Sequence, residues 1–235
     1  MQNKYLLKFV SLALLLILLI PGAANAGTGE NRNNNPVSQE RKRQIIKSIE
    51  EHLHTLKTLR AEFIQERHVA LFLDVLKSKG LLYFERPDKL RWELTEPYRT
   101  IMLFNDRNVA KFRIEKGKMD KASVGMEDLL RGVLGQIISI LKGDFGNSME
   151  AYNMEVFEGE NYLLRLLPKS ERMAESIQTL ELYFDKKTLN MSQIIIREPQ
   201  NDFMKIIFSN QRINETLNNE LFNLENPAYQ TRAYY

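Results

Sequence analysis

The three histidines are the first candidates to consider for acid–base or metal chemistry. His52 and His54 are two positions apart in a stretch with helical spacing. On a helix their side chains would point about 200° from each other, so they could not bind one metal ion together. His68 has no other histidine near it in the sequence. The histidines therefore predict no metal site.

Paired carboxylates, at Glu50-Glu51 and at Glu158 and Glu160, are the next candidates for catalysis. The first pair falls on the polar side of an expected helix and the second in an expected turn, where glutamate usually serves solubility. No Gly-x-Ser-x-Gly, His-Glu-x-x-His or Gly-x-x-x-x-Gly-Lys motif occurs, and there is no cysteine. We therefore expect a binding or carrier protein without metal or cofactor. A hydrolase with a carboxylate site stays open as an alternative.

The composition is that of a globular protein, with 43% hydrophobic and 27% charged residues among 235. The 12 Phe, 9 Tyr and 1 Trp argue against a wholly disordered chain. The formal net charge is +3, and it falls to +1 once Lys4 and Lys8 are removed with the segment described next. Such a balance excludes nucleic acid as a partner.

Residues 1–26 have the pattern of a cleavable signal peptide. Lys4 and Lys8 flank the start of an apolar run, Phe9 to Ile20, and Ala24-Asn25-Ala26 has the small-x-small pattern of a cleavage site. The run is too short to cross a bilayer comfortably, although an uncleaved anchor is the alternative interpretation. Because Gly27 rather than cysteine follows, we expect an exported chain, cut after Ala26, without a lipid of its own.

The rest of the chain divides into a polar lead segment, one domain and a short tail. Residues 27–39 are rich in Asn, Gly, Glu and Pro, which predicts a flexible segment. The domain is expected over residues 40–227, in a monomer, and residues 228–235 form a tail with no assigned structure.

Hydrophobic spacing within the domain predicts two helices and a series of short strands. The first helix is expected to run for about five turns and is marked by Ile45, Ile46, Ile49, Leu53, Leu56, Leu59 and Phe63. The second is expected over residues 126–142, with Gly132 and Gly135 weakening it. Strands are expected at 81–84, 90–94, 101–104, 109–114, 156–157, 162–167, 180–184, 191–196 and 203–208.

Short strands joined by short turns indicate an antiparallel sheet, and the helices need an apolar face to cover. In the strand around Trp92, the apolar Leu90, Trp92 and Leu94 alternate with Arg91 and Glu93, which predicts a strand buried on one face only. The fold class expected from these patterns is α+β.

The order of several short motifs resembles the periplasmic outer-membrane lipoprotein carrier family, LolA, over roughly residues 40–227. The motifs are LRAEFIQER (Leu59 to Arg67), GLLYFERPDKLRWELTEP (Gly80 to Pro97), TIMLFND (Thr100 to Asp106), the apolar helix near 126–142, YNMEVF, LLPK (Leu166 to Lys169) and a final Leu221-Phe222 strand. The family carries Phe-x-Gln near the end of the first helix, which corresponds to Phe63 and Gln65 here.

This resemblance implies an incomplete, unclosed antiparallel β-barrel whose short helices cover a concave apolar face. It also implies a periplasmic carrier that takes acylated lipoproteins from an inner-membrane ABC lipoprotein exporter and delivers them to the outer-membrane receptor LolB. Each acyl methylene contributes about 0.8 kcal/mol to membrane binding, so the cargo needs an enclosed apolar site in transit. Neither ATP binding nor another cofactor is implied.

The resemblance also implies roles for particular residues. Arg86, in the Arg-Pro turn, corresponds to the arginine that hydrogen-bonds to carbonyls of the lid helices and keeps the cavity closed. Leu90 corresponds to a bulky apolar residue at the cavity and exporter-contact region, and Trp92 is expected to line the cavity. The other residues expected to contact acyl chains are Phe63, Leu94, Leu130, Val133, Leu134, Ile137, Ile138 and Leu141.

The chain departs from the family pattern after the strand 101–104. The family has Asp-Gly followed by aromatic residues there, whereas this chain has Asp106-Arg107-Asn108 and later Lys111, with Phe112 as the aromatic residue. The exact cargo is therefore left open, and a carrier or sensor of another envelope lipid, such as a glycolipid, is the alternative.

Overall fold

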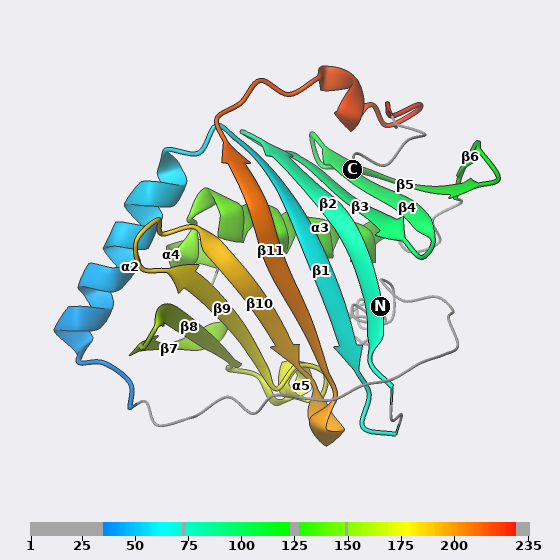
Figure 1. Cartoon of the computed structure of the whole chain (residues 1–235). Helices are drawn as coiled ribbons and strands as arrows, with labels where there is room; N and C mark the ends of the chain where they lie inside the picture. Colours follow the sequence, from blue (N-terminus) through cyan, green and yellow to red (C-terminus); the bar gives the residue numbers. More distant parts are fainter. Residues whose placement is uncertain (1–34, 72–73, 123–126, 149, 229–235) are drawn as a thin grey trace, which may run out of the picture. The chain divides into compact units, whose positions relative to one another are not determined.

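The computed structural model describes residues 35–71, 74–122, 127–148 and 150–228 (Figure 1). The predicted signal peptide, residues 27–34 of the lead segment and residues 229–235 of the tail lie outside the described residues. The helices are α2 (Gln39–His54), α3 (Glu127–Lys142), α4 (Phe145–Ser148) and α5 (Glu171–Ala174), with short 3-10 helices η2 (Pro199–Asn201) and η3 (Asn219–Phe222). The strands are β1 (Thr58–His68), β2 (Leu76–Glu85), β3 (Lys89–Glu96), β4 (Arg99–Asn105), β5 (Asn108–Glu115), β6 (Lys118–Lys121), β7 (Tyr152–Glu158), β8 (Asn161–Pro168), β9 (Thr179–Asp185), β10 (Met191–Arg197) and β11 (Phe203–Ile213).

The strands form one antiparallel sheet in the order β6-β5-β4-β3-β2-β1-β11-β10-β9-β8-β7. The first and last strands of this order do not pair with each other, so the sheet is not closed. Most neighbours in the sheet are also neighbours in the sequence, because short turns connect them. The α+β class and the unclosed antiparallel sheet with short helices are confirmed.

The chain divides into two compact units. Among the described residues, unit 1 comprises 35–53, 64–71, 74–77, 143–148 and 150–208, and unit 2 comprises 54–63, 78–122, 127–142 and 209–228. Strands β1 and β11 are long enough to contribute residues to both units.

In unit 1, α2 and α4 contribute apolar side chains to the core. Ile45, Ile49 and Leu53 follow one side of α2 and are 0–2% exposed, as helical spacing predicts. Phe145 of α4 packs edge-to-face on Phe184 of β9, with ring centroids 6.3 Å apart. Val37, in the described part of the predicted lead segment, donates its N–H to the Val156 carbonyl of β7 at 2.9 Å.

In unit 2, strands β2 to β6 form an antiparallel meander that is covered on both faces. We call the side that carries Leu82, Phe84, Leu90, Trp92, Met102 and Phe104 the helix face. It contacts α3, where a methyl group at position 135 would lie 4.0 Å from the Phe104 ring. We call the opposite side, with Arg91, Glu93, Ile101, Leu103 and Phe112, the tail face. Leu224 packs on this face, and the Leu221 carbonyl accepts a 2.9 Å hydrogen bond from Arg91.

The turn between β4 and β5 contains no glycine, although the family pattern described above has one at this place. Asp106 and Arg107 both have positive φ, of 48° and 66°, in a two-residue turn between the paired Asn105 and Asn108. Positive φ at both central positions is the geometry that matches the twist of a hairpin. Asp106 tolerates it well, whereas Arg107 adopts it without the glycine that favours it.

Two expectations about the elements were wrong, and one strand was not predicted. The first helix ends at His54, and Leu59 and Phe63 belong to β1, where Leu59, Ala61, Phe63, Gln65 and Arg67 alternate as buried residues. Their spacing of four, from Leu59 to Phe63, fits a strand as well as a helix, because four is also a multiple of two. Leu221-Phe222 lies in the 3-10 helix η3, not in a strand, and β6 was not expected at all.

The expectation that β3 is buried on one face only was also wrong. Arg91 and Glu93 are 1% and 2% exposed, because the segment around η3 covers the tail face. Arg91 donates two hydrogen bonds to one Glu93 oxygen, at 2.9 and 2.7 Å, and Arg99 donates to the other oxygen at 2.8 Å. The pairing of these charges makes their burial tolerable.

Candidate functional site

The predicted acyl-binding residues of the sheet come together on the helix face of unit 2. Cross-strand partners share a face of a sheet, and the register places Leu90 opposite Phe84 and Phe104, and Trp92 opposite Leu82 and Met102. Leu90, Trp92 and Leu94 are 0%, 1% and 8% exposed. The result is a continuous apolar layer that β2, β3 and β4 present to α3.

Phe63 of β1 joins this layer through an aromatic contact. Its ring lies 4.3 Å from that of Trp92, centroid to centroid, at an interplanar angle of 37°. Gly80 of β2 gives the ring its space, because a Cβ at that position would lie 2.2 Å from Phe63 Cζ and 2.3 Å from the Glu93 carbonyl oxygen. The glycine that opens the strand in the sequence pattern is thus a requirement of packing.

Helix α3 contributes the remaining residues of the predicted set. Leu130, Leu134 and Leu141 are each 1% exposed and Ile138 is 4% exposed, which defines the buried side of the helix. Ile137 is half-buried, and the Val133 side chain lies outside what the structure describes. Ile140, 3% exposed, belongs to the buried set but was not predicted.

Arg86 connects the end of α3 to the chain that precedes β1. Its Nε donates to the Leu56 carbonyl at 2.6 Å, and its Nη2 donates to the Lys142 carbonyl at the C-terminus of α3 at 3.0 Å. Lys142 in turn bonds Asp88 at 3.2 Å. The fork of the guanidinium lets one side chain hold two carbonyls that are far apart in sequence. We call these three bonds the Arg86 clasp.

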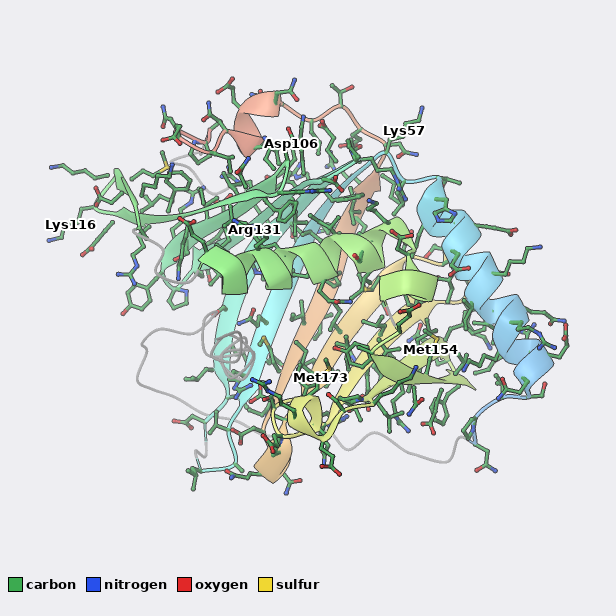
Figure 2. All side chains as sticks on the ribbon, turned by 180° about the vertical axis from the view of Figure 1, so that it is seen from behind. Lys57, Asp106, Lys116, Arg131, Met154 and Met173 are labelled. Carbon is green, nitrogen blue, oxygen red and sulfur yellow. The ribbon has the colours of Figure 1, made fainter. Side chains whose placement is uncertain are left out.

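The N-terminal half of α3 is attached to the same strands by another arginine–carbonyl bond. Arg131 donates from Nε to the carbonyl of Arg107, in the β4–β5 turn, at 2.8 Å (Figure 2). The Arg86 clasp and the Arg131 bond, near the two ends of α3, are therefore polar and partly exposed. The middle of α3 is held by apolar contacts.

Lys111 of β5 is a residue of the helix face that the sequence analysis did not place there. It lies opposite Met102 and is half-buried. Burial, and to a smaller extent the neighbouring charge of Arg113, lowers the pKa of the Lys111 ammonium. The alternation of β5 could have indicated this position, since Ala110 and Phe112 on either side face the other way.

Unit 1 contains a pocket of about 940 Å³ of a different character. None of the predicted acyl-binding residues lines it. Its charged groups include Glu181, 2% exposed, which accepts hydrogen bonds from Arg197 at 3.1 Å and from Tyr183 at 3.2 Å. These charged and polar groups satisfy one another, and apolar side chains such as Phe157 and Leu163 lie beside them, so the lining of the pocket is mixed in character.

Two of the histidines contact an amide oxygen and an aromatic ring. His52 Nε2 is 2.8 Å from the Asn190 side-chain oxygen, and His68 stacks on Phe203 at 4.0 Å. Burial is the main reason that the pKa of His68 is lowered. Across the described ranges, no three His, Asp or Glu side chains gather as metal ligands. No helix in the described part of the chain has the length and apolar character needed to cross a membrane.

Residues 54–225 match the family described as "Outer membrane lipoprotein carrier protein LolA". The outer-membrane lipoprotein carrier protein of Nitrosomonas europaea is 26% identical over 189 residues, covering 79% of this chain and 87% of the relative. The protein of that name from Methylococcus capsulatus is 27% identical over 183 residues, covering 75% and 81%.

Solved structures extend the likeness of fold. A crystal structure of MucB has a TM-score of 0.50 at 10% identity, covering 79% of this chain and 63% of that chain. At such low identity the likeness concerns the fold alone.

Proposed function

Since the chain belongs to the LolA family of outer membrane lipoprotein carrier proteins, we propose that it shuttles acylated lipoproteins across the periplasm with their acyl chains held between α3 and the helix face. The observation that carries this proposal is the apolar layer of the helix face, which α3 covers. A few polar bonds attach the ends of this helix to the rest of unit 2. The proposed activity is binding and release without catalysis.

The packed layer represents the closed, unloaded form in this proposal. Leu90, Trp92 and the buried side of α3 are at most 4% exposed, so acyl chains must separate α3 from the strands in order to bind. The Arg86 clasp opposes that separation, since it fixes the C-terminus of α3 to the 86–88 turn. Cargo then replaces the apolar contacts that α3 gives up, so opening costs little once a chain is present.

The partners proposed are those that the sequence resemblance implies. An inner-membrane ABC exporter supplies the cargo, because one sixteen-carbon acyl chain holds on the order of 12 kcal/mol in a membrane and would not leave unaided. The outer-membrane receptor LolB accepts it. Leu90 is 0% exposed here, so its proposed contact with the exporter requires the open form. The proposed location is the periplasm, reached through cleavage after Ala26.

Native mass spectrometry of protein purified from periplasm tests the proposal directly. Wild-type protein should carry masses that correspond to acylated lipoprotein. Arg86→Leu removes the hydrogen bonds to Leu56 and Lys142, so it should favour the open form, retain captured cargo and transfer it to acceptor membranes at least several-fold more slowly. Arg43→Leu is the matched control, because its side chain is 73% exposed and, among the described residues, bonds only Glu40 of its own helix.

The mass-spectrometry result distinguishes the lipoprotein carrier from a carrier of another lipid and from a hydrolase. A glycolipid or another envelope lipid in place of lipoprotein would keep the apolar site and replace the cargo. An empty protein that also fails to bind an acyl probe would contradict the carrier function and reopen the hydrolase alternative. Wild-type transfer rates in Arg86→Leu would contradict the role of the clasp.

A further inference from the structure

One row of cross-strand partners on the helix face ends in a charged residue. The register pairs Leu82 with Trp92, Trp92 with Met102, and Met102 with Lys111. Leu82, Trp92 and Met102 are 0–2% exposed, so the row is apolar over three strands. The Lys111 stem therefore extends from the end of a buried apolar row, on the side of the strands that α3 covers.

Among the described side chains, no carboxylate pairs with Lys111. Among the described residues, no ion pair or side-chain hydrogen bond of its ammonium is recorded. Arg113, two positions along β5 on the same face, adds a second positive charge. Asp120 of β6 lies opposite Arg113, and not opposite Lys111. A half-buried ammonium without an anion is unfavourable, and an anionic partner would remove that cost.

We propose that Lys111 binds a carboxylate or phosphate group of an amphiphilic cargo whose acyl chain lies along the Leu82–Trp92–Met102 row. This inference rests on the proposed carrier function and narrows the class of cargo, because ester- and amide-linked acyl chains have no charge of their own. The anion comes either from a lipid headgroup or from an acidic group next to the acylated end of the cargo. Arg113 contributes to the attraction, and Asp120 offsets part of its charge.

Acyl probes that differ only in charge test the proposal. cis-Parinaric acid and its methyl ester have the same fluorescent chain, but only the acid carries a carboxylate. Binding of both is titrated at pH 7.5 to wild-type protein and to Lys111→Met, Lys111→Arg and Lys116→Met. Lys116 is exposed in the β5–β6 turn, at the far end of that hairpin from α3 (Figure 2), so its variant changes the net charge equally without touching the helix face.

Wild-type protein should bind the acid about tenfold more tightly than the ester, as expected for a charge-assisted hydrogen bond. Lys111→Met should lose this preference with unchanged affinity for the ester, whereas Lys111→Arg and Lys116→Met should keep it. Displacement of the acid by palmitate, lysophosphatidic acid and lysophosphatidylcholine then identifies the source of the anion. Stronger displacement by lysophosphatidic acid indicates a phosphate headgroup, and stronger displacement by palmitate indicates a carboxylate.

Equal binding of acid and ester by wild-type protein would overturn the inference and leave the carrier function intact, because both probes bind. An equal loss of preference in Lys111→Met and Lys116→Met would also overturn it, since the effect would then be one of net charge. Failure of every variant to bind either probe would overturn the acyl-binding function together with the inference.

Discussion

Gly80 illustrates how a single residue of the sequence pattern acts through packing. Its backbone lies where Phe63 and the Glu93 carbonyl leave no space for a side chain, and the Phe63 ring in turn contacts Trp92. Glycine at this position therefore determines whether the aromatic pair of the helix face can form.

Gly80→Ala should lower the free energy of unfolding by about 1–3 kcal/mol, the usual cost of overpacking a core. The added Cβ would meet a backbone oxygen that cannot move without shifting β3. The midpoint of urea denaturation measures the effect. Gly146→Ala is the matched control. Among the described residues outside its own helix, no atom lies within 4 Å of the added Cβ, and alanine favours the helix in which it lies. Equal midpoints for Gly80→Ala and wild-type protein would contradict this account.

The burial of the apolar layer could be predicted from the sequence more completely than its surroundings. Leu90, Trp92 and Leu94 alternate in a short strand, and Leu130, Leu134, Ile138 and Leu141 share one side of a helix, so local periodicity was sufficient to predict that they are buried. That they bind acyl chains stays a prediction. Lys111 was not predicted for this face. Local alternation in β5 separates it from Ala110 and Phe112, but only the register of β5 on β4 places it beside Met102.

At the scale of elements, the short strands and turns were predicted well. The covering of a strand by a segment far away in the sequence was not predicted. Arg91 and Glu93 look solvent-facing in the sequence because nothing local shows that η3, more than a hundred residues later, covers them. The boundary between α2 and β1 was missed for a different reason. Leu56, Leu59 and Phe63 continue the helical spacing by coincidence, and only sheet pairing distinguishes the two periods.

The attachment of α2 to β7 makes part of the stability depend on pH. Arg41 of α2 donates two hydrogen bonds to Glu158, at 2.8 and 2.7 Å, and Lys186 lies 3.3 Å from the same carboxylate. The hydrogen bonds from Arg41 are the main reason that the pKa of Glu158 falls from 4.5 to about 2. A carboxyl group whose pKa is lower in the folded state stabilises the protein above its unfolded pKa.

This contribution should therefore be complete above pH 4.5 and disappear as the pH falls toward 2. Thermal unfolding of wild-type protein and Glu158→Gln at pH 7, 4.5 and 3 measures it. Wild-type Tm should fall more steeply between pH 4.5 and 3 than that of the variant. Glu40→Gln removes an exposed carboxylate of the same helix as a control, and it should retain the wild-type slope. Parallel pH profiles for wild-type protein and Glu158→Gln would refute the assignment.

For the molecule as a whole, the tail face shows that the C-terminal part of the chain completes the core of unit 2. Phe222 of η3 is 1% exposed, and Lys89 lies over its ring at 5.7 Å. Leu224 packs on the Ile101 and Phe112 cluster. Phe222 and Leu224 thus cover the tail face, which is the side of the strands opposite the proposed acyl site.

Phe222→Ala should cost about 3–5 kcal/mol of unfolding free energy, the range for removing a buried aromatic ring. Chemical denaturation measures this loss, and acyl-probe binding by the folded variant should be unchanged, because Phe222 belongs to the tail face. Leu71→Ala is the control, since Leu71 is 90% exposed and its truncation should be nearly neutral. A similar small effect for both variants would show that the C-terminal segment does not contribute to the core.

The open sheet has a consequence for how copies of this chain behave at high concentration. A sheet that does not close ends in two strands whose outer N–H and C=O groups could add a strand from another molecule. At one end, β6 is four residues long and three of them, Lys118, Asp120 and Lys121, are charged. At the other, Val37 donates to the Val156 carbonyl of β7. The short, charged β6 opposes strand addition at one edge, and the hydrogen bond from Val37 opposes it at the other. Together they keep an unclosed sheet from polymerising.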